Sequence, residues 1–283
     1  MRTPPNDKTS GLATTLLPAR WVRGLGGVLL AVGLILPWLI IKARTQQVAQ
    51  HLTTTSQETG PLRPEMVLLP ASRDVSVAIS ATEVTQGQYR RVMGELPGGK
   101  CELPKQGENF PVSCVTRADA ATFCNLLSDK EGLAPCYVTD RRGVWQTMPA
   151  CEGYRLPTTL EWEYAAMAET HQRYAGTDDD AAVCEYANVR DDFAVYACHD
   201  GFTAVAPVKQ YKPNAWFLYD MTGNVAEWTD NHTVRGGSWL SIIETTRLDT
   251  PMPTPPPSAP DLGFRIVRSP TASERRDLVQ DSR

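Results

Sequence analysis

The most restrictive feature of the sequence is an aromatic-rich stretch at residues 213–231, PNAWFLYDMTGNVAEWTDN. Its polar centre, DMTGNVAE, follows neither the two-residue period of a strand nor the 3.6-residue period of a helix. Gly223 can adopt the positive φ that a tight turn requires. The two carboxylates of this turn, Asp220 and Glu227, then need a partner inside an aromatic core, and a hard cation is the natural candidate.

Short regular elements are expected in the remainder of the chain. Apolar runs and alternation predict strands at residues 66–70, 75–79 and 262–267, and apolar spacing with caps predicts helices at residues 85–93, 117–128 and 158–167. Thr158 and Glu161 form a capping-box pattern, and Glu163 is assigned to the surface. Residues 176–231 show few regular elements, and the prolines of residues 249–261 predict an extended loop.

Six sequence blocks occur in the order typical of one family. Besides LYDMTGNVAEW, they are ATEVTQGQYRRVMG, FPVSCVTRADAATFCNLLS, YRLPTTLEWEYAA, VRGGSW and LGFRIVR. The chain therefore resembles the formylglycine-generating enzyme, or sulfatase-modifying factor, family over roughly residues 66–268. The resemblance implies an α+β, C-type-lectin-like fold with low regular secondary structure.

An apolar segment precedes this region and predicts one transmembrane helix. Residues 24–41 carry no charge, and their length is near the roughly 20 residues that span a bilayer. Lys42 and Arg44 follow, where a cleaved signal peptide, the alternative, would have a small-residue cleavage site. The positive-inside rule favours a cytoplasmic N-terminus, and so a plasma (inner) membrane location with the C-terminal domain periplasmic or otherwise extracytoplasmic.

The resulting domain organisation has five parts. They are a disordered N-terminal tail (1–20), a transmembrane anchor (21–42), a polar tether (43–64), a sulfatase-modifying-factor-like domain (65–269) and a polar C-terminal tail (270–283).

Seven cysteines indicate an oxidising compartment if they pair. Three pairings close loops of similar length: Cys101 with Cys114, Cys136 with Cys151, and Cys184 with Cys198. Each such loop would contribute about 3 kcal/mol in the chain-entropy model. Cys124 remains, on the buried face of a predicted helix, and the connectivity stays open at this point.

The resemblance also implies two structural calcium ions. The second family site corresponds to Asp220, Glu227 and the backbone oxygens of Gly223 and Val225. The first corresponds to Asn188, Val189, Asp200 and Phe202. Asp220 stands where the enzyme usually has asparagine, which adds charge for Ca²⁺. The alternative is that these acids cap turns and that the aromatics are plain core.

The catalytic cysteine pair of the family is missing. Aerobic members use O₂ and copper(I), held by two cysteines just after the GGS block, to convert a peptide cysteine to formylglycine. The corresponding residues are Ser241 and Thr246. Because copper(I) is soft and selects thiolates, we expect neither copper nor this activity.

A binding function remains possible without that chemistry. In VRGGSW, Arg235 and Trp239 mark a predicted ligand groove; alternatively, Arg235 forms a salt bridge with Glu227 or Asp230. We expect a non-catalytic binding or accessory module, a pseudoenzyme, for a peptide, protein or envelope component. An oxidoreductase acting on a secreted peptide or metabolite is the alternative. The net charge of −4 argues against a nucleic-acid partner.

Overall fold

The computed structural model describes residues 60–190, 199–250 and 254–281. Residues 60–283 form one compact unit, separate from residues 1–59. The predicted N-terminal tail, the anchor and most of the tether therefore lie outside the described residues. Within the part of the chain that is described, no helix is long and apolar enough to cross a membrane.

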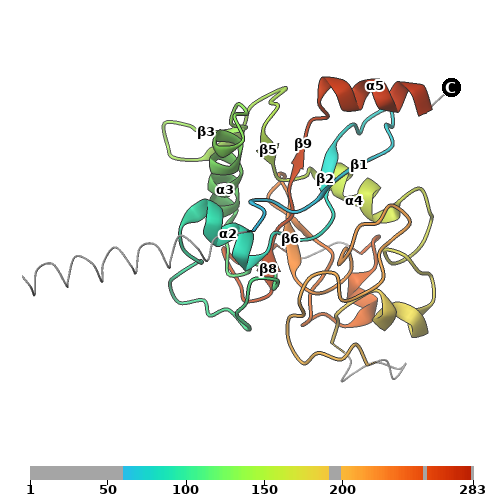
Figure 1. Ribbon diagram of the computed structural model, residues 1–283. Coiled ribbons are helices and arrows are strands. Elements are labelled where there is room, and N and C mark those ends of the chain that lie inside the picture. Colours follow the sequence, from blue (N-terminus) through green and yellow to red (C-terminus); the bar gives the residue numbers. More distant parts are fainter. Residues whose placement is uncertain (1–59, 191–198, 251–253, 282–283) are drawn as a thin grey trace, which may run out of the picture. The chain divides into compact units, whose positions relative to one another are not determined.

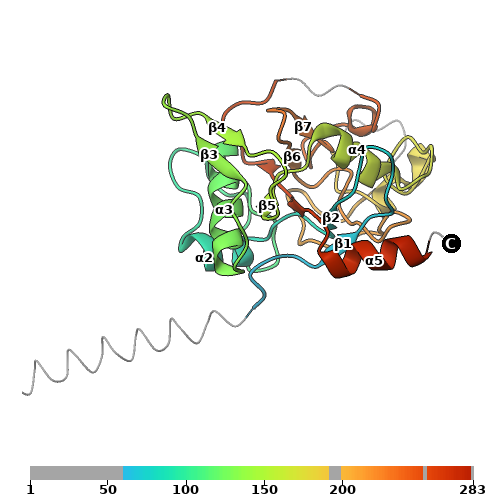
Figure 2. The ribbon, with the colours of Figure 1, turned by 90° about the horizontal axis from the view of Figure 1, so that it is seen from above.

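A four-stranded antiparallel sheet lies at the centre of the unit (Figures 1 and 2). Its strands, in spatial order, are β1 (Met66–Leu68), β2 (Ala78–Ser80), β9 (Val267–Arg268) and β5 (Tyr154–Arg155). Val67 lies opposite Ile79, which lies opposite Val267. Because side chains alternate between faces, these three residues form an apolar row on one face.

Helices cover both faces of this sheet (Figures 1 and 2). On one side, α2 (Gln86–Met93) packs against α3 (Arg117–Lys130), and α3 packs against β5. Phe123 on α3 stacks on Tyr89 at 5.7 Å and meets Phe264 edge-on at 5.3 Å. On the other side, Trp162 of α4 (Thr159–Met167) packs in the same apolar cluster as the Val67, Ile79 and Val267 row.

The three predicted helices are confirmed, and each begins with a capping box. The pairs of cap and third residue are Thr85 with Gln88, Thr116 with Asp119, and Thr158 with Glu161. Glu161 is also bound by Arg155 at 2.6 Å and is only 8% exposed, so its role extends beyond the cap.

The remaining elements are too short to produce a sequence period. They are the hairpin of β3 (Tyr137–Thr139) and β4 (Trp145–Thr147), the sheet β7 (Val234–Arg235), β6 (Ala226–Trp228) and β8 (Leu262–Gly263), and the 3₁₀ helices η1 (Asp180–Glu185) and η2 (Ile243–Thr246). β6 pairs antiparallel with β7 and parallel with β8.

All three predicted strands differ in extent from the observed ones; the first, predicted at residues 66–70, ends at Leu68. The predicted closing strand at residues 262–267 is divided between β8 and β9, in separate sheets, because residues 264–266 cross the core between them. The predicted strand at residues 75–79 begins only at Ala78, although Val75 and Val77 are buried.

The predicted polar tail contains helix α5 (Ala272–Asp281). Thr271 and Glu274 exchange backbone-to-side-chain hydrogen bonds of 2.7 and 3.2 Å, which is a capping box that the sequence TASE signals. Arg268 on β9 binds Glu274 through both oxygens, at 2.7 and 2.8 Å. The hydrogen bonds from Arg268 lower the pKa of Glu274 to about 2.

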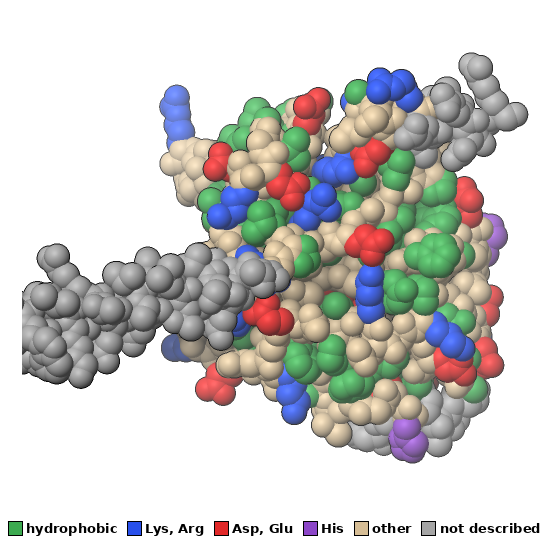
Figure 3. All heavy atoms as spheres, viewed as in Figure 1, with side chains coloured by type: hydrophobic (Ala, Val, Ile, Leu, Met, Phe, Trp, Pro, Cys, Tyr) green, Lys and Arg blue, Asp and Glu red, His purple; other side chains and the backbone are tan. Residues whose placement is uncertain are grey.

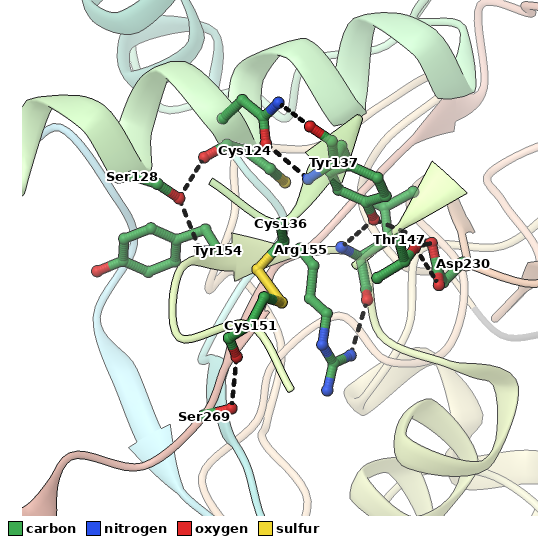
Figure 4. Close-up of a disulfide and its surroundings, with 12 residues drawn as sticks. Cys124, Ser128, Cys136, Tyr137, Thr147, Cys151, Tyr154, Arg155, Asp230 and Ser269 are labelled. Carbon is green, nitrogen blue, oxygen red and sulfur yellow. Dashed lines mark hydrogen bonds between the residues drawn. A yellow bond between two sulfur atoms is a disulfide. The ribbon is translucent and has the colours of Figure 1, made fainter. Parts of the chain in front are cut away.

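Two of the three predicted disulfides, Cys101–Cys114 and Cys136–Cys151, are present. Figure 4 shows the second of these together with Cys124 on α3. Cys198 lies outside the described residues, so the pairing predicted for Cys184 stays a prediction. Cys124 is a free thiol with no exposed surface.

Cys124 is expected to be unreactive in the folded protein. Burial, followed by the nearby charge of Asp230, raises the pKa of this thiol, so little thiolate forms. Iodoacetamide at mildly alkaline pH should modify Cys124 only after denaturation, as read by peptide mass spectrometry. The variant Arg142→Cys, at a side chain that is 81% exposed, is the control that must react in the folded state. Equal labelling of Cys124 before and after denaturation would contradict this expectation.

Candidate functional site

The Asn214 side chain joins the start of the signature stretch to helix α4. The Asn214 side chain accepts hydrogen bonds from the backbone of Trp216 and Leu218 at 3.0 and 3.1 Å. It donates to the carbonyl of Ala165 on α4 at 2.8 Å. The irregular turn is therefore fixed by a buried polar anchor.

The turn glycine is confirmed. Gly223 has a φ of 76°, and a Cβ built on it would lie 2.1 Å from the carbonyl oxygen of Asn188. A side chain there would clash with backbone, so only glycine allows the two segments to approach this closely.

A fully buried ion pair lies at the centre of the site. The guanidinium of Arg265 binds both oxygens of Glu227, from Nε at 2.6 Å and from Nη2 at 2.7 Å. The side chains are 0% and 1% exposed. Trp162 on α4 also donates to Glu227 at 2.6 Å, and Arg265 donates to the carbonyl of Ser80 at 3.0 Å. The pair thereby connects the four-stranded sheet and the β7-β6-β8 sheet to α4.

A second pair of carboxyl groups, those of Glu83 and Asp220, adjoins this ion pair. Asp220 Oδ2 accepts from the backbone of Lys209 at 2.9 Å, and Glu83 Oε1 accepts from the Asn224 amide at 3.0 Å. The other two oxygens, Asp220 Oδ1 and Glu83 Oε2, are buried and receive no hydrogen bond from any described residue. The two carboxyl groups are close enough for the negative charge of Asp220 to raise the pKa of Glu83.

Burial governs the protonation of these acids. It raises the pKa of Asp220 to about 6. Burial, together with the negative charges of Asp220 and Glu227, raises the pKa of Glu83 well above its ordinary value. Three carboxylates face one guanidinium here, so the cluster needs protons or a cation for its charge to balance.

The second predicted calcium set fits a cation in part. Asp220 offers an unpartnered oxygen, as a ligand would. Each oxygen of Glu227 already accepts a hydrogen bond from Arg265, and Oε2 accepts another from Trp162. Gly223 and Val225 lie in the same buried turn. Among the described residues, no group of three or more His, Cys, Asp or Glu side chains has a metal-binding arrangement.

The residues of the first predicted calcium set are brought together. Asp200 accepts from the backbone of Val189 at 2.9 Å and from that of Phe202 at 2.8 Å, which is the turn-capping arrangement considered as the alternative. Asn188 donates to the Asn224 side chain at 3.1 Å. Asn224 also binds Glu83, so it connects the first predicted set to the pair of Glu83 and Asp220. Calcium binding at both stays a prediction.

Ser241 and Thr246, at the copper positions, meet beside Gly237. A Cβ on Gly237 would lie 2.6 Å from Thr246 Cγ2 and 3.3 Å from Ser241 Oγ. Ser241 Oγ accepts from the backbone of Ser238 at 3.0 Å, and Thr246 Oγ1 donates to the carbonyl of Ile243 at 2.8 Å. Both hydroxyls are thus engaged internally. A cavity lined by Gly237 and Thr246 has a volume of about 10 Å³, which leaves room for about one water at most.

Arg235 forms neither of the predicted salt bridges. Instead of Glu227 or Asp230, it binds Glu163 of α4 at 2.9 Å. That prediction was wrong because Glu227 is committed to Arg265. Asp230 is bound instead by Arg117 at 2.8 Å and by hydroxyl groups, which include that of Thr147 (Figure 4).

A cleft of about 530 Å³ opens beside Arg235. Its lining residues include Glu163, Met167, His171, Arg235 and Leu248. Trp239 does not reach it and lines a different hollow, with Val189 and Asp200. The two predicted groove residues therefore belong to separate sites. On the face drawn in Figure 3, positive and negative side chains are interspersed rather than gathered by sign.

Comparison with known proteins gives matches over most of the described chain. A family model described as a sulfatase-modifying factor enzyme 1-like domain matches residues 57–270. A protein of Paenibacillus barcinonensis named chaperone protein LppX is 34% identical, over 68% of this chain and 79% of its own length. The bovine protein named inactive C-alpha-formylglycine-generating enzyme 2 is 35% identical, over 62% of this chain and 56% of its own.

A solved structure shares the fold. The crystal structure of CarF superposes with a TM-score of 0.60 and 27% sequence identity, covering 75% of this chain and 100% of that one. The similarity extends over nearly all of the described unit.

Loss of Arg265 is expected to be strongly destabilising. Arg265→Ala leaves Glu227 buried without its counter-ion, so the free energy of unfolding should fall by about 3–5 kcal/mol. Arg90→Ala, which removes an exposed pair with Glu108, is the control and should cost less than about 1 kcal/mol. Urea unfolding of the full chain measures both. Similar costs for the two variants would show that the buried pair has no special role.

Proposed function

Because the chain belongs to the family of sulfatase-modifying factor enzyme 1-like domains, we propose that it is a non-catalytic accessory module that binds a peptide, protein or envelope component. The observation that carries this proposal is the state of the copper positions. Ser241 and Thr246 present no thiolate, and their hydroxyls are hydrogen-bonded within the fold. Hard oxygen donors of this kind are poor ligands for copper(I).

The names of two relatives support an accessory role. The bovine relative is named an inactive formylglycine-generating enzyme, and the Paenibacillus relative is named a chaperone. These names are precedents for a family member that does not carry out the enzyme's reaction. By analogy we infer that this chain assists or recognises a partner protein.

The cleft at Arg235 is the site we assign to the ligand. Its volume of about 530 Å³ lies in the range of small-ligand and peptide side-chain pockets. Met167 and Leu248 supply apolar lining, and Arg235 supplies a guanidinium that Glu163 holds in place. An oriented cation beside an apolar wall suits an extended peptide that carries both an acidic and an apolar group.

We further propose a single-pass anchor at residues 24–41 that places the domain on the extracytoplasmic side of a plasma membrane. This rests on the uncharged run in the sequence and its basic flanks. The disulfides Cys101–Cys114 and Cys136–Cys151 support it, because such bonds persist in oxidising compartments.

Structural calcium is proposed as the cofactor. In the first set, Asp200 and Asn188 with the backbone of Val189 and Phe202 would hold the ion. In the second set, Asp220 has the oxygen available for it. Calcium there would neutralise buried carboxylates and order a fold with little regular structure.

The peptide-binding proposal can be tested with a random peptide library displayed on phage and selected on the immobilised full chain. Selected peptides should bind Arg235→Ala at least tenfold more weakly in fluorescence anisotropy, because the oriented guanidinium is lost. Arg142→Ala, at an exposed arginine paired with Asp140, is the matched control and should bind normally. Equal binding to wild type and Arg235→Ala would overturn the assignment of this cleft.

The non-catalytic proposal can be tested by copper loading. Wild-type chain should not withdraw copper(I) from a chromophoric chelator, whereas Ser241→Cys combined with Thr246→Cys should, because both positions adjoin Gly237. Cys124→Ser alone controls for the free thiol. Conversion of a cysteine peptide to formylglycine by wild-type chain would disprove the proposal.

A further inference from the structure

We propose that Glu83 and Asp220 together ligate a divalent cation in the core, and that Glu227, the carboxylate assigned to this ion by the family pattern, serves the Arg265 ion pair instead. The inference deepens the proposed calcium site and depends on it. It assigns a ligand, Glu83, that the sequence pattern does not include.

The first argument is the position of the unpartnered oxygens. Glu83 Oε2 and Asp220 Oδ1 are buried and lack a hydrogen-bond partner in the described structure. They are the two carboxylate oxygens among the buried side-chain atoms of this kind. Both residues are nearly fully buried, at 0% and 2% exposure. Buried polar atoms in native proteins are almost always satisfied, and a buried carboxylate oxygen is among the costliest to leave alone.

The second argument is that each carboxylate is already oriented by its other oxygen. Asp220 Oδ2 is held by the backbone of Lys209, and Glu83 Oε1 by the amide of Asn224. Asn224 is itself fixed, because its oxygen accepts from the backbone of Ala206 at 2.9 Å. The two remaining oxygens are therefore preorganised on neighbouring carboxyl groups, as ligands of one ion need to be.

The third argument concerns Glu227. Its oxygens accept three hydrogen bonds of 2.6 to 2.7 Å from Arg265 and Trp162. A carboxylate has about four acceptor positions, so three of those of Glu227 are already taken. Glu83 accepts one hydrogen bond, at Oε1 from the Asn224 amide.

The fourth argument is charge. The carboxylates of Glu83, Asp220 and Glu227 carry three negative charges, and Arg265 carries one positive charge. One divalent cation balances the two negative charges that are left. Lys209 does not supply this charge through its ammonium group, which is directed to Glu65 at 3.0 Å and to the ring of Tyr219 at 5.1 Å. Oxygen-only donors in a buried, irregular turn suit Ca²⁺ in particular.

The test uses Ca²⁺ and the full chain in detergent, after treatment with a chelator. Calcium affinity is measured by titration calorimetry, and the melting temperature is measured with and without Ca²⁺. Wild-type chain should bind Ca²⁺ and melt at a higher temperature with it, and Glu83→Gln should bind at least tenfold more weakly. Glu161→Gln, which replaces another largely buried glutamate paired with Arg155, is the matched control and should keep wild-type affinity.

Glu83→Asp provides a second variant that keeps the charge of the cluster but withdraws the carboxylate by one methylene. It should also weaken binding, and it covers the case in which Glu83→Gln does not fold. Unchanged affinity in either folded variant, with calcium bound by wild type, overturns the assignment of Glu83 and leaves the calcium proposal intact. Absence of any calcium effect on wild type overturns both, while the peptide-binding and copper tests still decide the proposed function.

Discussion

The ion pair between Glu227 and Arg265 is the interaction on which the arrangement of the domain depends. Arginine does not lose its proton inside proteins, so a buried guanidinium must be matched by a carboxylate and by carbonyl oxygens. Here Glu227 supplies the carboxylate, and Ser80 and Tyr219 supply the carbonyl oxygens. Segments far apart in the sequence are thereby required to meet at one point, which explains how a core with so few long elements keeps one geometry.

The region around Gly237 shows how the local fold accommodates serine and threonine at the two positions where the family enzyme has cysteines. Gly236 and Gly237 both have positive φ values, and Gly237 still allows Ser241 and Thr246 to approach one another. The two positions therefore lie close together in the fold. Hydroxyl groups at those positions turn inward to hydrogen-bond with nearby backbone, so a reactive pair is replaced by a structural one.

The helices and two disulfides could be predicted from the sequence because their signals are local. A capping threonine followed by Gln, Asp or Glu three residues later marks each helix start, and α5 has the same signal at Thr271. Strands of two or three residues leave no such pattern, and their pairing is decided by distant partners. The partner of Arg235 could not be predicted either, because Glu163 is distant from it in the sequence. Glu83 carried one usable signal, a lone acid in the apolar run AISATEV, where burial demands compensation.

The position of β9 has a consequence for the order in which the molecule can be completed. Val267 and Arg268 follow the other described strands in the sequence, yet they form the strand between β2 and β5. Before they are synthesised, β1 and β2 have no strand pairing that links them to β5, and before Arg265 is synthesised Glu227 lacks its counter-ion. A growing chain therefore cannot close its core strand by strand. Completion of the central sheet must wait until residue 268 has been synthesised, and a premature stop before residue 262 removes the centre of the domain rather than its edge.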